Sequence, residues 1–152
     1  VARKSVDWQV LVVIAASFAL GRALEITGAA EAIAHSLVGF ASENPWTSLV
    51  IIYGVTMLFT ELITNNAAAV LIFPIALSIS QQLKVDFTPF AMCIMMAASA
   101  SFSTPIGYQT NLMVLGPGGY KFTDYFRVGI PLNLTMWTIT SCLAPVIWPF
   151  HP

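Results

Sequence analysis

The chain has 152 residues, of which 57% are hydrophobic and 9% are charged, and its formal net charge at pH 7 is -1. Soluble domains average about 25% charged residues, so a soluble fold is excluded and we expect an integral membrane protein. The near-neutral charge also argues against broad electrostatic binding of nucleic acid. Because the chain begins at Val1 rather than Met and no signal peptide precedes its first apolar run, we interpret this end as truncated.

The first two predicted elements are a span and a surface helix. Residues 8–24 form an apolar run long enough to cross a hydrocarbon core of about 30 Å. Residues 29–40 are too short to span, and Ile33, Leu37 and Phe40 recur at helical spacing. This pattern predicts an interfacial helix that lies along the membrane surface.

Residues 47–83 read as a helical hairpin. Two apolar arms, 47–63 and 67–83, flank a polar tip at 64–66. Each arm is about 25 Å long if helical. That length fits either two thin spans or a re-entrant hairpin with a buried tip, and both return the chain to the same side.

The rest of the chain reads as a broken helix and a final span. Residues 90–115 are apolar, but Pro105 and Gly107 fall within a polar interruption. Proline removes a helical hydrogen bond and glycine loosens the backbone, so we expect a discontinuous helix here. Residues 128–148 then form one apolar run that predicts a last spanning helix.

The hairpin tip carries chemistry suited to ions. Asn65 and Asn66 are good N-cap residues, and free backbone N–H groups at the start of the second arm favour an anion. Free carbonyls at the end of the first arm, with the Thr64 hydroxyl, suit a small hard cation such as Na⁺. Discontinuous helices of transporters hold substrate and coupling ions in this way. The competing interpretation is that these side chains only cap helices.

Two further features have alternative interpretations. Glu61 lies one turn before the tip and is either a carboxylate that faces the site or a partner that anchors the helix. We favour a functional role, with Glu61 as a candidate coupling carboxylate, because ionisable groups inside membranes usually have a function. The small residues 97–101 predict a close helix–helix seam rather than a binding site.

Two runs resemble the divalent-anion/sodium symporter family, whose members carry a citrate-transporter-like domain. Residues 60–69, Thr-Glu-Leu-Ile-Thr-Asn-Asn-Ala-Ala-Ala, resemble its second hairpin signature, in which the tip usually reads Ser-Asn-Thr. Residues 97–111 resemble the broken helix that follows, but Tyr-Gln-Thr replaces the Thr-Pro-Pro of the dicarboxylate members. The form of residues 104–120 is similar to a branch that includes sulfate transporters.

The resemblance implies an all-α integral membrane fold in which this chain is the second inverted repeat, with an interfacial helix, a re-entrant hairpin, a broken helix and a final span. It implies a multi-pass protein of the cell membrane that forms a homodimer with an N-terminal repeat in each subunit. It further implies elevator-type, Na⁺-coupled transport of a small anion, either sulfate or a dicarboxylate. The substrate-binding residues that it implies are Thr64, Asn65, Asn66, Tyr108, Gln109, Thr110 and Asn111, and the Na⁺ ligands are Thr64, Asn65, Gly107 and Gln109.

The sequence is compatible with three other functions. An arsenite permease or a Na⁺/H⁺ antiporter shares the inverted-repeat plan, and an antiporter requires that Glu61 titrates during transport. A membrane scaffold or accessory subunit without transport is the third alternative. An enzyme is not expected, because the sequence has no paired-His metal motif and no Gly-x-Ser-x-Gly elbow.

Overall fold

The computed structural model describes residues 44–151 and scattered residues between 12 and 32. The predicted span at 8–24 and the predicted interfacial helix at 29–40 therefore fall largely outside the described residues. From residue 44 onward the chain is helical, and no strand occurs among the described residues. The all-helical prediction is confirmed for this part. The helices are α3 (Pro45–Thr60), α4 (Asn65–Leu83), α5 (Thr88–Ser99), α6 (Gln109–Leu115) and α7 (Phe122–Ile147).

Local signals explain where the hairpin helices begin and end. The Asn44 side chain accepts a hydrogen bond from the Trp46 backbone N–H over 2.9 Å, and Pro45 occupies the first turn of α3, where its missing N–H costs nothing. α4 ends at Lys84, which has a left-handed φ of 55°. This conformation stops a helix, because it turns the backbone away from the helical path.

The helix break in the hairpin lies earlier than the predicted tip at 64–66. α3 ends at Thr60 and α4 already begins at Asn65, so the break is Glu61–Thr64. The cap of α4 is Thr64, whose Oγ1 accepts from the Ala67 N–H over 3.2 Å, and not Asn65 or Asn66. A threonine hydroxyl caps a helix well, so the two asparagines enter its first turn.

The last helix also begins earlier than the predicted span at 128–148. α7 starts at Phe122, because the Asp124 carboxylate accepts from the Lys121 N–H over 2.8 Å and caps the first turn. Charged residues in this first turn hid the start of the helix from a count of apolar residues. α7 contains Pro131 and Pro145 and nevertheless continues to Ile147.

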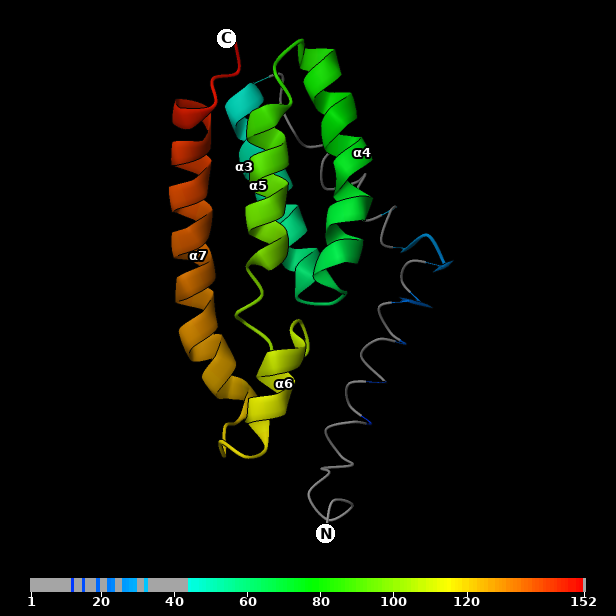
Figure 1. The fold of residues 1–152 in the computed structure, drawn as a ribbon, viewed down its shortest axis with the longest axis vertical. Helices are drawn as coiled ribbons and strands as arrows, with labels where there is room; N and C mark the ends of the chain where they lie inside the picture. The colour runs from blue at the N-terminus through cyan, green and yellow to red at the C-terminus, as the bar shows by residue number, and fades with distance from the viewer. Residues whose placement is uncertain are drawn as a thin grey trace.

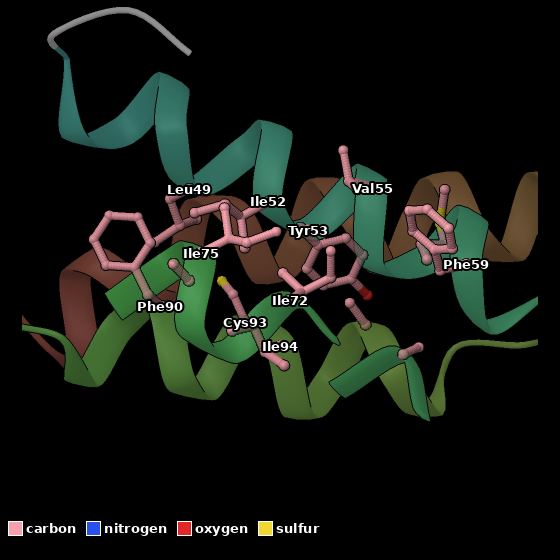
Figure 2. Packing of buried hydrophobic residues seen from close by; sticks show 14 of the residues in the cluster. Leu49, Ile52, Tyr53, Val55, Phe59, Ile72, Ile75, Phe90, Cys93 and Ile94 are labelled. Atoms are coloured by element: carbon pink, nitrogen blue, oxygen red, sulfur yellow. The ribbon is translucent and has the colours of Figure 1, made fainter. Parts of the chain in front are cut away.

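The hydrophobic core lies between α3, α4 and α5 (Figure 2). Leu49, Ile52 and Tyr53 of α3 are fully buried, and so are Ile72 of α4 and Phe90 of α5. In a bilayer an uncovered helix face meets lipid rather than water, so these side chains contribute mainly through close van der Waals packing. Most of α3 is buried, although Trp46 and Leu58 are exposed, and α4, α5 and α7 pack around it.

α7 runs antiparallel to α3, as hydrogen bonds from two indoles show. Trp46 Nε1 donates to the Ser141 carbonyl over 3.1 Å, and Trp137 Nε1 donates to the Val50 carbonyl over 3.0 Å. Gly54 leaves room for the Trp137 ring, since a Cβ there would lie 2.9 Å from it. The turn between α3 and α4 lies part-way along α7, level with the link between α5 and α6 (Figure 1).

Two of the described helices, α4 and α7, are long and apolar enough to cross a membrane. Their outer faces carry exposed apolar side chains, such as Val70 on α4 and Val128 and Val146 on α7. Apolar faces that a soluble protein would bury are suited to contact with lipid or with further transmembrane helices.

Candidate functional site

The two helix breaks of the chain meet. The first separates α3 from α4, and the second is the non-helical segment 100–108 between α5 and α6. The Ser103 N–H donates to Glu61 Oε1 and the Thr104 N–H donates to Glu61 Oε2, each over 2.8 Å. The Thr104 hydroxyl also donates to the Glu61 carbonyl over 3.1 Å. Both oxygens of the carboxylate are therefore engaged in joining the breaks.

Thr60 links the start of α4 to the end of α5. Its Oγ1 lies 2.7 Å from the Ala98 carbonyl and 2.9 Å from Asn65 Oδ1. Its own carbonyl accepts from the Ser101 hydroxyl over 3.2 Å. Ala98 and Ser101 are buried, so the predicted seam of small residues packs here against the end of α3.

Gly107 lies so close to the break of the hairpin that no side chain would fit there. A Cβ at this residue would collide with the Ser101 hydroxyl and lie 2.8 Å from the Thr60 carbonyl oxygen and 3.0 Å from the Glu61 Cα. A side chain of any size would force the two breaks apart. Thr60 contacts Asn65 at the start of α4 and Gly107 in the second break. The structure therefore brings these two predicted Na⁺ ligands to the same residue.

The N-terminus of α4 is open on one side. Thr64 and Asn66 are exposed and Asn65 is half-buried. The Thr64 hydroxyl serves the Ala67 N–H, which leaves other N–H groups of the first turn without a side-chain cap. The positive end of the helix dipole therefore faces this open side.

Asn111 braces the second break. Its Nδ2 donates to the Ser101 carbonyl over 3.2 Å and to the Thr104 carbonyl over 3.3 Å. The Tyr125 hydroxyl of α7 donates to the Asn111 carbonyl over 2.8 Å. Asn111 thus holds two carbonyl groups of the second break in place, and Tyr125 links this residue to α7. The contact of Asn111 with a substrate stays a prediction.

The remaining predicted substrate residues lie at the start of α6. Tyr108, Gln109 and Thr110 are all exposed. In the described part of the chain no hydrogen bond joins them to Thr64 or Asn66 of the hairpin. Their contact with a substrate stays a prediction.

The donor set of the two breaks is neutral apart from Glu61. Neither break contains Lys or Arg, and among the described residues no group of three His, Cys, Asp or Glu side chains could hold a metal ion. What the breaks offer is oxygen from carbonyls, hydroxyls and amides. Such a set suits Na⁺ rather than a transition metal.

Comparison with known proteins identifies the family. The model of the citrate transporter family matches residues 2–151. The chain belongs to this family. An uncharacterized transporter of Synechocystis is 38% identical over 149 residues, which make up 97% of this chain and 24% of that protein.

Two other relatives carry functional names. Sodium/sulfate cotransporter 1 of Chlamydomonas reinhardtii is 37% identical over 141 residues, or 91% of this chain and 16% of that protein. Solute carrier family 13 member 2 of Mus musculus is 28% identical over 141 residues, or 93% of this chain and 24% of that protein. The chain thus spans a quarter or less of the length of these three relatives. The resemblance to divalent-anion/sodium symporters is confirmed.

Sequence reasoning missed several residues that hold the site together in this member of the citrate transporter family. Asn133 of α7 is 4% exposed, and its Nδ2 donates to Glu61 Oε1 over 2.8 Å and to the Ser103 hydroxyl over 2.7 Å. A polar side chain in the apolar run 128–148 was the available signal, because such groups are costly at membrane depth unless they have partners. Thr60 and Tyr125 carried no comparable signal.

Proposed function

We propose that the parent protein of this chain transports a small divalent anion, sulfate foremost, coupled to Na⁺. The single observation that carries the proposal is the meeting of the two helix breaks beside the open N-terminus of α4. The name of the Chlamydomonas sodium/sulfate cotransporter supports the same anion and cation. The loss of the dicarboxylate signature at residues 108–110 favours sulfate over a dicarboxylate.

The anion is placed at the start of α4. This helix has 19 residues, and its first turn offers backbone N–H groups and the positive end of the dipole. Thr64 and Asn66 add an exposed hydroxyl and an exposed amide. Sulfate is an acceptor of hydrogen bonds only, so donors without a formal charge can hold it, as long as water is excluded when the site closes.

The Na⁺ ions are placed where helix ends present oxygen. The residues that we propose as ligands are Thr64, Asn65, Gly107 and Gln109. Support comes from Asn65 and Gly107, which both lie against Thr60. A cation at this position would neutralise part of the charge of a neighbouring anion, which explains how a site without Lys or Arg can be specific for an anion.

The hairpin is proposed to be re-entrant. Asn133 lies near the middle of α7, whose 26 residues are about 39 Å long, and it contacts Glu61 at the break of the hairpin. The 16 residues of α3 therefore reach only part of the length of α7. If α7 spans the bilayer, the two breaks lie near its middle, where polar backbone is tolerated only beside protein or a cavity.

The remaining parts of the mechanism belong to the whole protein. We propose that an N-terminal repeat supplies the other half of the site, that two subunits associate as a homodimer and that the site moves by an elevator-type displacement. The exposed face at Thr64, Asn66 and Tyr108 has no covering element among the described residues, which supports the first of these proposals. The proposed location is the cell membrane.

Glu61 is proposed to anchor the site. Its carboxylate accepts from the N–H groups of Ser103 and Thr104 and from the Asn133 amide. Each of these donors needs an acceptor at this buried position, so the contacts support the anchoring role of Glu61.

The test is uptake of labelled sulfate, and separately of succinate, into proteoliposomes that hold the full-length parent protein, with and without an inward Na⁺ gradient. Sulfate uptake that requires the gradient is expected. Uptake of succinate alone would replace sulfate by a dicarboxylate. A folded protein that takes up neither anion would contradict the proposal and return attention to the arsenite, antiporter and scaffold alternatives.

A second arm of the experiment tests the residues. Asn65→Ala and Asn111→Ala are expected to reduce uptake, because the first removes a proposed ligand and the second removes the brace of the second break. Thr138→Ala is the control, since its exposed hydroxyl donates only within α7, to the Leu134 carbonyl. Unchanged uptake in both asparagine variants would contradict the proposed site.

A further inference from the structure

Asn133 stands at the junction of three segments that are far apart in the chain. Its Nδ2 donates to Glu61 Oε1 at the end of α3 over 2.8 Å and to the Ser103 hydroxyl in the second break over 2.7 Å. The Ser103 N–H donates to the same carboxylate oxygen. The side chain of Asn133 thereby completes a closed set of hydrogen bonds among α3, the α5–α6 link and α7.

The amide of Asn133 can adopt only one orientation here. If it were rotated so that Oδ1 faced Glu61, an amide oxygen would lie against a carboxylate oxygen, and two acceptors would repel. In the observed orientation Oδ1 is buried and has no hydrogen-bond donor among the described residues. A buried acceptor without a partner costs free energy. The two hydrogen bonds that Nδ2 donates are therefore made at the cost of one unsatisfied acceptor.

The backbone around Asn133 is also shaped for this contact. Gly129 lies one helical turn earlier on the same face of α7. A Cβ at Gly129 would collide with the Phe102 carbonyl and lie 2.5 Å from the Ser103 Cα. The glycine lets α7 approach the non-helical segment closely enough for the short Asn133 side chain to reach both of its acceptors.

We propose that Asn133 is a positioning residue for transport, which fixes the distance between the two helix breaks by holding Glu61 and Ser103 together. The inference rests on the proposed Na⁺-coupled transport and adds to it a residue on α7 that does not touch the ions. Thr104, which follows Ser103, donates to the Glu61 carbonyl and accepts from the Gly107 N–H. A shift of Ser103 is therefore passed on to Gly107, a proposed Na⁺ ligand.

The first experiment measures Na⁺-driven sulfate uptake by the parent protein in proteoliposomes, as wild type and as Asn133→Ala. Loss of the amide is expected to raise the apparent KM for Na⁺ and for sulfate together by about tenfold, because a displacement of about 1 Å already costs large factors in a preorganised site. Vmax per folded protein is expected to change less. Thr138→Ala, on the same helix, should keep wild-type values. KM values of Asn133→Ala equal to those of the wild type would overturn the proposal, whatever its thermal stability.

A second experiment reads the contact without transport. Asn133→Asp places a carboxylate beside Glu61, and like charges at this distance are unfavourable. Adding Glu61→Gln exchanges the amide and the carboxylate and restores a donor–acceptor pair. The double variant is expected to unfold in detergent at a higher temperature than Asn133→Asp and to regain part of its uptake. A double variant no more stable than Asn133→Asp would refute the contact.

The two experiments separate the inference from the function on which it rests. A wild-type protein that takes up no anion contradicts the proposed function, and the unfolding temperatures still test the Asn133–Glu61 contact. A wild-type protein that transports sulfate, together with an Asn133→Ala variant of unchanged KM, contradicts the inference alone.

Discussion

Asn133 Nδ2 lies 2.8 Å from Glu61 Oε1, although 72 residues separate the two in the chain. Glu61 is 8% exposed and Asn133 is 4% exposed, so the hydrogen bond is shielded from solvent. A buried carboxylate costs several kcal/mol unless donors surround it. Here two backbone N–H groups and one amide surround the carboxylate. The hydrogen bond from Asn133 also fixes the break of the hairpin at one position along α7.

Replacement of Glu61 by Gln is expected to destabilise the parent protein. Glutamine has nearly the same shape, but one of its two acceptor oxygens becomes an NH₂ group that faces a backbone N–H of Ser103 or Thr104. Leaving such a buried donor unsatisfied costs about 1–3 kcal/mol. The measurement is thermal unfolding of the purified protein in detergent.

Asp124→Asn is the matched control for that substitution. Asp124 also accepts a backbone N–H, from Lys121, but it is exposed, so water replaces the lost contact. Its unfolding temperature should change less than that of Glu61→Gln. Equal changes in the two variants would mean that the buried network contributes no more than an ordinary helix cap.

Elements of this chain that depend on local patterns could be predicted from the sequence. The hairpin arms, the discontinuous helix and the small-residue seam follow from runs of apolar residues and from Pro105 and Gly107. Helix ends were less accessible, because Thr64 and the two asparagines after it are all good caps and only geometry selects among them. The start of α7 was hidden by Lys121, which is its N-cap, and by Asp124 in its first turn.

Contacts between distant segments could not be predicted in this way. Glu61 has two plausible roles in the sequence, and the structure distinguishes them only by showing Ser103, Thr104 and Asn133 around the carboxylate. Asn133 is one polar residue in an apolar run, so its burial could be anticipated but its partners could not. The family resemblance located the breaks without specifying what holds them together.

Replacement of Gly107 by Ala is expected to separate the two breaks. The added methyl group would meet the Ser101 hydroxyl and the Thr60 carbonyl, and the second of these is backbone that cannot rotate away. Overpacking of this kind costs about 1–3 kcal/mol. Sodium-driven uptake should fall strongly, because Gly107 is a proposed ligand of Na⁺.

Introducing Gly107→Ala into a Ser101→Ala variant shows which contact causes the loss of uptake. Ser101→Ala removes the hydroxyl that the new methyl group would meet, at the cost of the hydrogen bond to the Thr60 carbonyl. The Gly107→Ala defect should persist in this background, since the clash with backbone remains. Full recovery of uptake would show that the close approach of the backbone is unimportant.

Asp86, in the loop between α4 and α5, is expected to make the folding stability of the protein depend on pH in the acid range. Hydrogen bonds from the hydroxyl and then from the backbone N–H of Thr88 hold the pKa of this carboxyl below its usual value. Because the folded state binds the proton less readily than the unfolded state, the contribution is present above the unfolded pKa of about 3.9 and is lost as the pH falls through the lowered value.

The variant Asp86→Asn isolates this contribution. The unfolding temperature of the wild-type protein should fall more steeply than that of the variant as the pH is lowered below about 4. The other carboxylates titrate in both proteins, so the difference between the two curves reports Asp86. Parallel curves would mean that the contact with the start of α5 has no effect on stability.

Thr64 allows the cap of α4 to be separated from the binding of the anion. Thr64→Ala removes the acceptor of the Ala67 N–H and should cost about 1 kcal/mol of stability. Thr64→Ser keeps the hydroxyl and should preserve both stability and uptake. These two variants alone do not distinguish a cap from a binding residue, because both roles use the same oxygen.

Thr64→Asp distinguishes them. Aspartate is among the best N-cap residues and its charge is favourable at the positive end of a helix, so the unfolding temperature should be at least that of the wild type. The same negative charge would lie where we place the sulfate ion, so the apparent KM for sulfate should rise steeply. If Thr64→Asp transported sulfate with an unchanged KM, Thr64 would not contact the anion, which would have to bind elsewhere.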